Sequence, residues 1–495
     1  MKDSVIISIL GLFQVALAFV YQILIANIFG IGNDLDIFYA SNTFNLIIVG
    51  VATSSINFAV TPILIKYYKN NDLIKLRNVS NTIFNIVLFL FIILAFIQYF
   101  FSTQIVNLIL PGFSGEKLQL TVKFYRIQAF LSIITVLSGI LMALHYTFKN
   151  FYRTVIMPTI GQLFSILFVI FTYKKLGVYS LLYGLILSQS ANFILLSFPF
   201  IKYYKFSIKL NKDLIHTFKK IYPLLISGTF SKSNIAVDRF FASSLGGGSI
   251  ALLQYGQRII KIISGLINRG ISIVTLRKFS FNSDDEYKFK KQFIFTYQTM
   301  VFIIMPVVFL IVFFLKDALQ IIILSDRLNA GDVRNIYLVV CAFIGIFIGG
   351  SLSGVIVNAF YSKGLTNLIA KITIILQIIG IGFKIGLFFL IGFWGLPIAF
   401  SITSLLNTVV LLILYNMKIY RINFNKISSY MLRILGISFI AMIIPLSSNT
   451  FFNHTFISAC INSLFFIILY FVISIIFEKN VSVFIFNKFK KRFAI

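Results

Sequence analysis

The feature that most constrains this chain is a series of fourteen apolar stretches, each long enough to cross a bilayer. A helix needs about 20 apolar residues to span roughly 30 Å of hydrocarbon. Of the 495 residues, 59% are hydrophobic and only 12% are charged, far from the composition of soluble domains. We therefore predict an all-α integral membrane protein with about fourteen transmembrane helices, which excludes soluble enzymes and pumps that carry their own motor domain. The predicted spans are 5–29, 37–65, 80–102, 120–147, 154–172, 178–201, 221–244, 250–276, 293–315, 335–360, 366–391, 396–417, 431–447 and 455–477.

Basic residues divide unevenly between the two sides of the membrane. With the N-terminus in the cytoplasm, 28 Lys and Arg fall in tails and loops on that side and 6 on the other. Lys and Arg are retained on the cytoplasmic side, so we predict that both termini are cytoplasmic. Most of the net charge of +29 is then a topology signal and an attraction to anionic phospholipid, and we expect no nucleic-acid partner.

Nine basic residues remain inside the predicted spans, where a charge at mid-bilayer costs about 2.5–3.5 kcal/mol unless it faces protein or water. Lys232 and Arg239 are seven residues apart and return to one helix face. Arg258 and Arg269, eleven apart, do the same, and Lys261 lies one turn from Arg258. The nine are Lys123, Arg126, Lys232, Arg239, Arg258, Lys261, Arg269, Lys371 and Lys384.

The seventh and eighth spans are joined by the short link 246–249, so they are expected to be antiparallel neighbours whose basic faces line one cavity. Such a cavity suits a phosphate or diphosphate. The alternative is that individual side chains pair with helix carbonyls or extend to the membrane surface. Asp238 is the one acidic residue within the predicted spans. It could form a salt bridge with a neighbouring cation, or it could couple transport to the movement of an ion. Motifs for nucleotide, zinc or serine chemistry are missing, so we predict no cofactor, no metal and no catalytic residue.

A shift of 216 residues superposes four pairs of identical residues and indicates an internal repeat. The repeat predicts two pseudo-symmetric six-helix lobes followed by two further helices. The predicted divisions are an N-lobe over 1–201, a basic cytoplasmic linker over 202–220, a C-lobe over 221–417 and a final pair of helices with a basic tail over 418–495. The superposed pairs are Ala26 with Ala242, Gly30 with Gly246, Gly32 with Gly248 and Tyr39 with Tyr255.

Two segments resemble a known family. "ANIFGIGNDLDIFYASNTFNLI" with "SSINFAVTPIL" is similar to the first two helices of MurJ-type (MviN-like) lipid II flippases, whose pattern is FGxGxxxDAFxxA and then FxP. "SNIAVDRFFASSLGGGSIALLQYGQRIIKIISG" resembles their seventh and eighth helices. The resemblance implies a flippase of the multidrug/oligosaccharidyl-lipid/polysaccharide exporter superfamily, in the bacterial cytoplasmic membrane. It places Asp36 on the aspartate of the family's DAF motif, and Arg258 on the arginine that its eighth helix contributes to the cavity.

The chain also departs from this pattern. Peptidoglycan members of the family carry arginines in the first helix and after the second helix's Pro-Asn, whereas the regions around Gln14, Val15 and Tyr21 and around Asn45, Leu46 and Ile47 hold no basic residue. Lys232, Arg239 and Lys261 could carry the diphosphate instead. The substrate therefore stays open between lipid II and a surface-polysaccharide repeat unit.

We expect transport of an undecaprenyl-diphosphate-linked saccharide from the inner to the outer leaflet by alternating access, driven by the membrane potential. Other glycan-assembly membrane proteins are expected partners. A cation-coupled multidrug exporter of the same superfamily and a membrane-embedded glycan polymerase or ligase are the alternatives. The predicted substrate-binding residues are Arg258, Lys261, Arg239, Lys232, Arg269 and Asp36, and the candidates for gating or coupling are Asp238, Gly246 and Gly248.

Overall fold

The computed structural model describes residues 2–209, 212–282, 284–448 and 456–478. Within these ranges every secondary-structure element is a helix. The predicted all-α membrane fold is confirmed. The chain forms two compact units, 1–254 and 255–495, that divide within helix α10. The predicted lobe boundaries stay a prediction.

The first unit is built from helices that pack in neighbouring pairs. Helix α3 lies against α6 and α9, α4 lies against α6, and α7 and α8 form a hairpin that turns at Gly177, where φ is +53°. Its elements are α1 (Lys2–Phe29), α2 (Asn33–Ser41), α3 (Thr43–Lys69), α4 (Leu73–Phe100), α5 (Ser102–Ile109), α6 (Gly115–Thr147), α7 (Arg153–Leu176), α8 (Tyr179–Ser197), the 3-10 turn η1 (Ile201–Tyr203), α9 (Lys212–Ser243) and the start of α10 (Ser249–Phe281).

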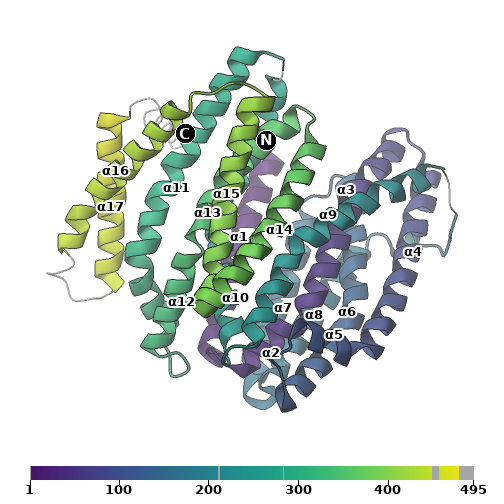
Figure 1. Cartoon of the computed structure of the whole chain (residues 1–495). Helices are drawn as coiled ribbons and strands as arrows, with labels where there is room; N and C mark the ends of the chain where they lie inside the picture. The colour runs from purple at the N-terminus through teal and green to yellow at the C-terminus, as the bar shows by residue number, and fades with distance from the viewer. Residues whose placement is uncertain (1, 210–211, 283, 449–455, 479–495) are drawn as a thin grey trace. The chain divides into compact units, whose positions relative to one another are not determined.

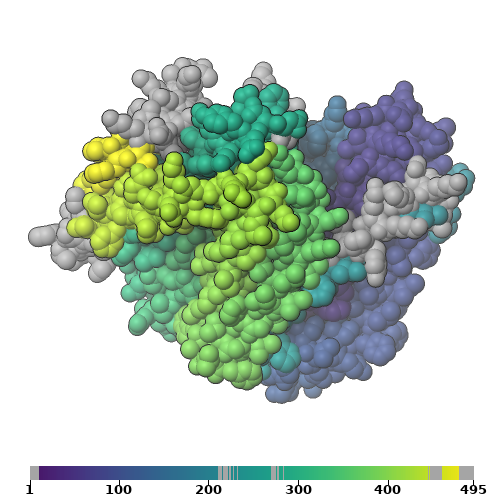
Figure 2. Space-filling model, turned by 45° about the horizontal axis from the view of Figure 1, so that its top comes forward, coloured from purple at the N-terminus to yellow at the C-terminus, as the bar shows by residue number. Residues whose placement is uncertain are grey.

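The second unit contains the remainder of α10 and the helices that follow it. Figure 1 shows α13, α14 and α15 side by side, and α16 and α17 pack on α11. Helix α14 lies at the surface of its unit, in green in Figure 2, with apolar side chains such as Ile375 and Phe389 exposed as in a lipid-facing helix. The elements are α11 (Glu286–Ile323), α12 (Ala330–Ala342), α13 (Ile344–Ser362), α14 (Thr366–Ile391), the 3-10 turn η2 (Gly392–Trp394), α15 (Gly395–Lys418), α16 (Phe424–Ser448) and α17 (Phe456–Phe477).

Each of the fourteen predicted spans lies largely on helix, but two are broken well inside their length. The second span divides at Asn42 into α2 and α3, and the tenth divides at Phe343 into α12 and α13. Among the described residues, twelve segments are long and apolar enough to cross a membrane, and one of them, Thr366–Lys418, contains both α14 and α15. Helix α9 is not among the twelve, because charged and polar residues lower its mean hydropathy.

Two helices begin with the same charged N-cap. Asp72 accepts a hydrogen bond from the Lys75 backbone N–H (3.1 Å), and Asp285 accepts one from Lys288 (2.9 Å). Each carboxylate also pairs with the ammonium group of that lysine, at 2.8 Å. The lysine's hydrogen bonds hold the pKa of both aspartates below the usual value. These caps satisfy amide groups that the first helical turn leaves unpaired.

Helices α13 and α15 approach closely through small residues. A Cβ atom at Gly349 would lie 2.5 Å from the Ser404 carbonyl oxygen, whereas one at the adjacent Gly350 would meet nothing within 4 Å. Thr408 donates a hydrogen bond from its hydroxyl to the Gly349 carbonyl at 2.9 Å. Small residues allow such backbone contact between membrane helices.

This contrast predicts opposite effects of the same substitution at neighbouring positions. Gly349→Ala should lower the free energy of unfolding by about 1–3 kcal/mol through overpacking. Gly350→Ala should raise it by up to about 1 kcal/mol, because alanine favours helix. Denaturant unfolding in detergent micelles measures both, and equal stability of the two variants would contradict the observed packing.

Candidate functional site

The connection between α1 and α2 places a carboxylate inside the first unit. Gly30 follows the end of α1 with φ at +66°, and Gly32 is extended and precedes α2. The first turn of α2 carries Asp34, which is exposed, and Asp36, which is only 1% exposed. One helical turn therefore holds one solvent-facing and one buried acid.

Asp36 caps the start of α10. Its Oδ2 atom accepts a hydrogen bond from the Gly248 N–H at 2.7 Å, and Oδ1 accepts one from the Ala251 N–H at 2.9 Å. These two donors belong to the amide groups that a helix leaves unpaired at its N-terminus, where the helix dipole also favours a negative charge. The carboxylate thus ties α2 to the beginning of α10.

Lys117 supplies a third donor to the same carboxylate. Its Nζ lies 3.1 Å from Asp36 Oδ2 and 2.9 Å from Asn33 Oδ1, and 4.1 Å from the centre of the Phe113 ring. The Lys117 side chain is 20% exposed, so the ion pair is partly reached by solvent. We call Asp36, Lys117, Gly248 and Ala251 the Asp36 cluster.

The glycine link before α10 fits tightly against the connection before α2. A Cβ atom at Gly247 would lie 2.5 Å from Asn33 Oδ1. One at Gly248 would lie 2.5 Å from Ile31 Cγ2, and φ at Gly248 is +90°, a region that favours glycine. A Cβ at Gly246 would meet nothing within 4 Å. Of the two glycines predicted for gating, Gly248 is required by the geometry, while space alone does not require Gly246.

Arg239 joins α9 to α10. It is 3% exposed; one terminal nitrogen donates to the Ile250 carbonyl oxygen at 2.8 Å and the other to Gln254 Oε1 at 2.5 Å. Its neighbour Asp238 is also 3% exposed. Both terminal guanidinium nitrogens are engaged within the protein, and the predicted substrate-binding role of Arg239 stays a prediction.

Arg258 and Lys261 lie one turn apart on α10 and are more accessible. Arg258 is half-buried and Lys261 is exposed, whereas Ile259 and Ile260 beside them are buried. One turn further on, a Cβ atom at Gly265 would meet nothing within 4 Å, so the helix surface stays open there. The side chain of Arg269 lies outside the described residues. The convergence of this face with Lys232 on one cavity stays a prediction.

The other membrane cations differ in their surroundings. Lys232 on α9 is exposed and comes close to α3, since a Cβ at Gly50 would lie 3.6 Å from Lys232 Cε. Arg126 donates from Nε to the Ser102 hydroxyl at 2.7 Å. Lys384 is 1% exposed, with Nζ 4.7 Å from the centre of the Phe400 ring. Lys123 contacts Tyr179, and Lys371 is exposed.

Sequence reasoning missed Lys117 and Asn33. Lys117 lies between the predicted spans 80–102 and 120–147, and nothing in its spacing connects it with an aspartate 81 residues earlier. Asn33 was also hard to predict as a partner of Lys117, because the side chain of an Asn at the start of a helix usually accepts a hydrogen bond from a backbone N–H of that helix.

The fold is shared with solved membrane proteins. The structure resembles a solved lipid II flippase MurJ in an inward closed conformation, with a TM-score of 0.84 and 21% identity over 96% of this chain and 99% of that one. It also resembles an inward-facing multidrug resistance MATE transporter of the MOP superfamily, with a TM-score of 0.68 and 14% identity over 82% of this chain and 94% of that one. These similarities define the class of fold as all-helical and membrane-spanning.

The sequence identifies the family within this class. The profile of the family described as "Lipid II flippase MurJ" matches residues 25–471, and the chain belongs to that family. A probable lipid II flippase MurJ of Buchnera aphidicola subsp. Acyrthosiphon pisum is 24% identical over 431 residues, 83% of each chain. One of Vibrio cholerae is 23% identical over 433 residues, 83% of this chain and 82% of the relative. The resemblance noted from the sequence is confirmed.

The Asp36 cluster predicts energetic coupling between Asp36 and Lys117. Asp36→Asn and Lys117→Met should each destabilise the protein, and the double variant should lose less than the sum, with a coupling energy of about 1 kcal/mol or more. Denaturant unfolding in detergent micelles gives the three values. Asp34→Asn, on the same helix turn, is the control and should not couple to Lys117→Met; equal coupling for both aspartates would refute the specific contact.

Proposed function

We propose that this protein moves an undecaprenyl-diphosphate-linked saccharide, with lipid II as the first candidate, from the inner to the outer leaflet of the bacterial cytoplasmic membrane. Membership of the MurJ family and the names of its relatives support this substrate class. Both termini lie in the cytoplasm in this proposal, as the distribution of Lys and Arg favours.

The observation that carries the proposal is the accessible basic pair on α10. Arg258 and Lys261 sit one turn apart, within a helix whose neighbouring positions are buried and apolar. A guanidinium group offers forked donors to phosphate oxygens, and an ammonium group adds a mobile charge. Two cations at one turn spacing suit a diphosphate, which carries charge on adjacent phosphates. Other cations, such as Arg239, serve in this proposal to hold the helices that present the pair.

Transport proceeds by alternating access in this proposal, and the Asp36 cluster acts as an outer latch. With the predicted topology, the start of α2, the link before α10 and Lys117 all lie on the outer side of the membrane. The backbone N–H groups of Gly248 and Ala251 and the Lys117 ammonium group would separate from Asp36 when the outer side opens, and they would return when it closes. Gly248 supports this role, because its lack of a side chain lets the link seat against Ile31.

The basic pair predicts a charge-dependent loss of transport. Arg258→Gln should lower the rate of lipid II flipping in proteoliposomes by about 10- to 100-fold, since a charge-assisted hydrogen bond to phosphate is worth about 1.5–3 kcal/mol. Arg258→Lys should retain part of the activity. Arg334→Gln, an exposed arginine near the start of α12, is the control with unchanged activity. A fully active Arg258→Gln variant, folded and present at normal levels, would remove the diphosphate site.

A surface-polysaccharide repeat unit is the second candidate substrate. The region of the first helix around Gln14 and Val15 and the region around Asn45 hold no basic residue, unlike the pattern of peptidoglycan members. Comparing purified lipid II with an undecaprenyl-diphosphate carrying a different saccharide in the same vesicles separates the two. The multidrug exporter is less favoured, because a cationic drug would meet the excess of basic residues. Anionic phospholipid and other glycan-assembly proteins are proposed partners.

The membrane potential is the proposed driving force. An inside-negative potential favours outward movement of an anion by about 2.3 kcal/mol per charge per 100 mV. Proteoliposomes with an imposed potassium diffusion potential should therefore flip substrate faster toward the positive side than vesicles without a potential, and reversal of the potential should reverse the bias. Equal rates under both signs would exclude voltage as the drive.

A further inference from the structure

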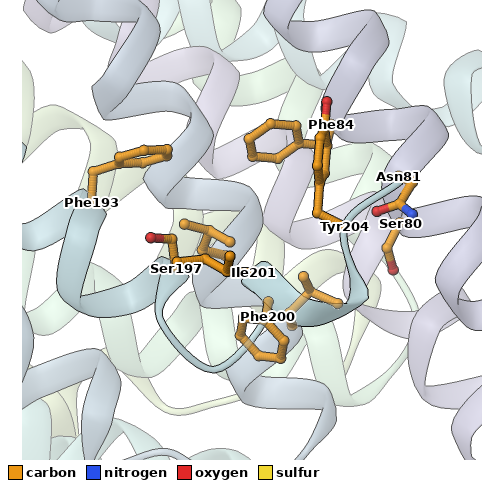
Figure 3. Close-up of a pocket in the computed structure, with 10 residues that line it drawn as sticks. Ser80, Asn81, Phe84, Phe193, Ser197, Phe200, Ile201 and Tyr204 are labelled. Carbon is orange, nitrogen blue, oxygen red and sulfur yellow. The ribbon is translucent and has the colours of Figure 1, made fainter. Parts of the chain in front are cut away.

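A cavity of about 430 Å³ opens between α4, α6 and α8 beneath the segment that follows α8. Figure 3 shows Phe193 and Ser197 of α8 on one side and Ser80, Asn81 and Phe84 of α4 on the other. The volume is in the range of small-ligand sites. The residues that line it are Ser80, Asn81, Phe84, Leu141, Leu144, Phe193, Ser197, Phe200, Ile201 and Tyr204. Its lining is mainly aromatic and aliphatic, which suits an alkyl chain better than a saccharide.

The roof of this cavity is fixed to α4 by hydrogen bonds. Arg77 Nε donates to the Tyr203 carbonyl oxygen at 2.7 Å, and the Tyr204 hydroxyl donates to Asn85 Oδ1 at 2.8 Å. Asn85 Nδ2 in turn donates to the Ser207 carbonyl oxygen at 3.0 Å. The Phe84 and Tyr204 rings meet edge to face at 5.6 Å. The cavity is therefore held open by a pre-organised segment, which lowers the cost of binding.

The segment over the cavity has the composition of a membrane interface. Residues 198–209 contain three exposed lysines and no acidic residue. Phe198, Tyr203 and Phe206 are 77%, 63% and 62% exposed. Aromatic side chains at the headgroup level and basic residues near an anionic surface are typical of membrane-contacting segments. Lys202 follows the lining residue Ile201 in the sequence and is exposed, so the segment that covers the apolar cavity carries positive charge.

We propose that this cavity binds one acyl chain of an anionic phospholipid, whose phosphate is held by Lys202 and Lys205. The basic flank matches an anionic headgroup, and a single acyl chain suits the volume, whereas a long polyprenyl chain exceeds it. The cavity shares no lining residue with the Asp36 cluster. It would anchor the segment after α8 to the anionic leaflet, independently of which saccharide is transported.

Photo-crosslinking of the full-length protein in phosphatidylcholine vesicles tests the proposal. The probes are phosphatidylglycerol and phosphatidylcholine with a diazirine on one acyl chain, and peptide mass spectrometry locates the label. We expect phosphatidylglycerol to label residues 80–84 and 193–204 at least fivefold more than phosphatidylcholine does. Equal labelling by the two lipids, or preferential labelling by a polyprenyl-phosphate probe, would overturn the assignment.

Two sets of variants separate the acyl-chain site from the headgroup site. Ser197→Phe fills the cavity and should abolish cavity labelling by phosphatidylglycerol. Lys202→Gln with Lys205→Gln should reduce it by up to about 25-fold, since each lysine near an anionic headgroup contributes about fivefold. Lys174→Gln with Lys175→Gln, two exposed lysines at the end of α7, is the matched control and should leave labelling unchanged. Unaltered labelling in the Lys202 and Lys205 variant would refute the headgroup contact even where Ser197→Phe fails to fold.

Discussion

The cost of placing a charge in hydrocarbon determines how the cations of this protein are arranged. Arg239 meets that cost with the Ile250 carbonyl and Gln254, and Arg126 meets it with the Ser102 hydroxyl. Lys384 lies over the Phe400 ring, whose face attracts a cation. These side chains connect one helix to another. Arg239 and Lys384 are buried, whereas Arg258 is half-buried and Lys261 is exposed, so the membrane cations differ in how far a ligand could reach them.

Two glycines that the predicted internal repeat matches, Gly32 and Gly248, lie close together in the first unit. The link at Gly248 approaches Ile31 and Gly32, so the glycine pattern of one copy packs on that of the other. The same shift of 216 residues aligns Asp36 with Leu252, and the carboxylate therefore exists in one copy only. The unpaired amide donors at the start of α10 need an acceptor, which Asp36 supplies. The predicted repeat is therefore not symmetric at this position.

The sequence was sufficient for the class of fold and the positions of the spans, because hydropathy reports directly on a lipid environment. It did not predict the breaks at Asn42 and Phe343. The polar residues around Asn42 are a short interruption within one long apolar stretch, and no polar residue marks Phe343. The partners of Asp36 come from residues 81 and more than 200 positions away, and no spacing rule relates them. The helix period of the seventh span predicts that Arg239 faces a ligand, and that role stays a prediction. The hydrogen bonds from Arg239 to α10 depend on how two helices pack, which the period alone does not determine.

Two ionic contacts of this protein differ in a way that suits different roles in the proposed transport cycle. Arg239 is 3% exposed, so breaking its contacts would leave a charge without water, which favours a permanent connection between α9 and α10. In the Asp36 cluster, Asp36 is itself only 1% exposed, but Lys117 is 20% exposed, so water reaches one partner of the ion pair. Solvent can hydrate the Lys117 ammonium group when that ion pair separates. The proposed outer latch therefore uses the partly hydrated pair of Asp36 and Lys117, while the contacts of Arg239 suit a connection that stays closed.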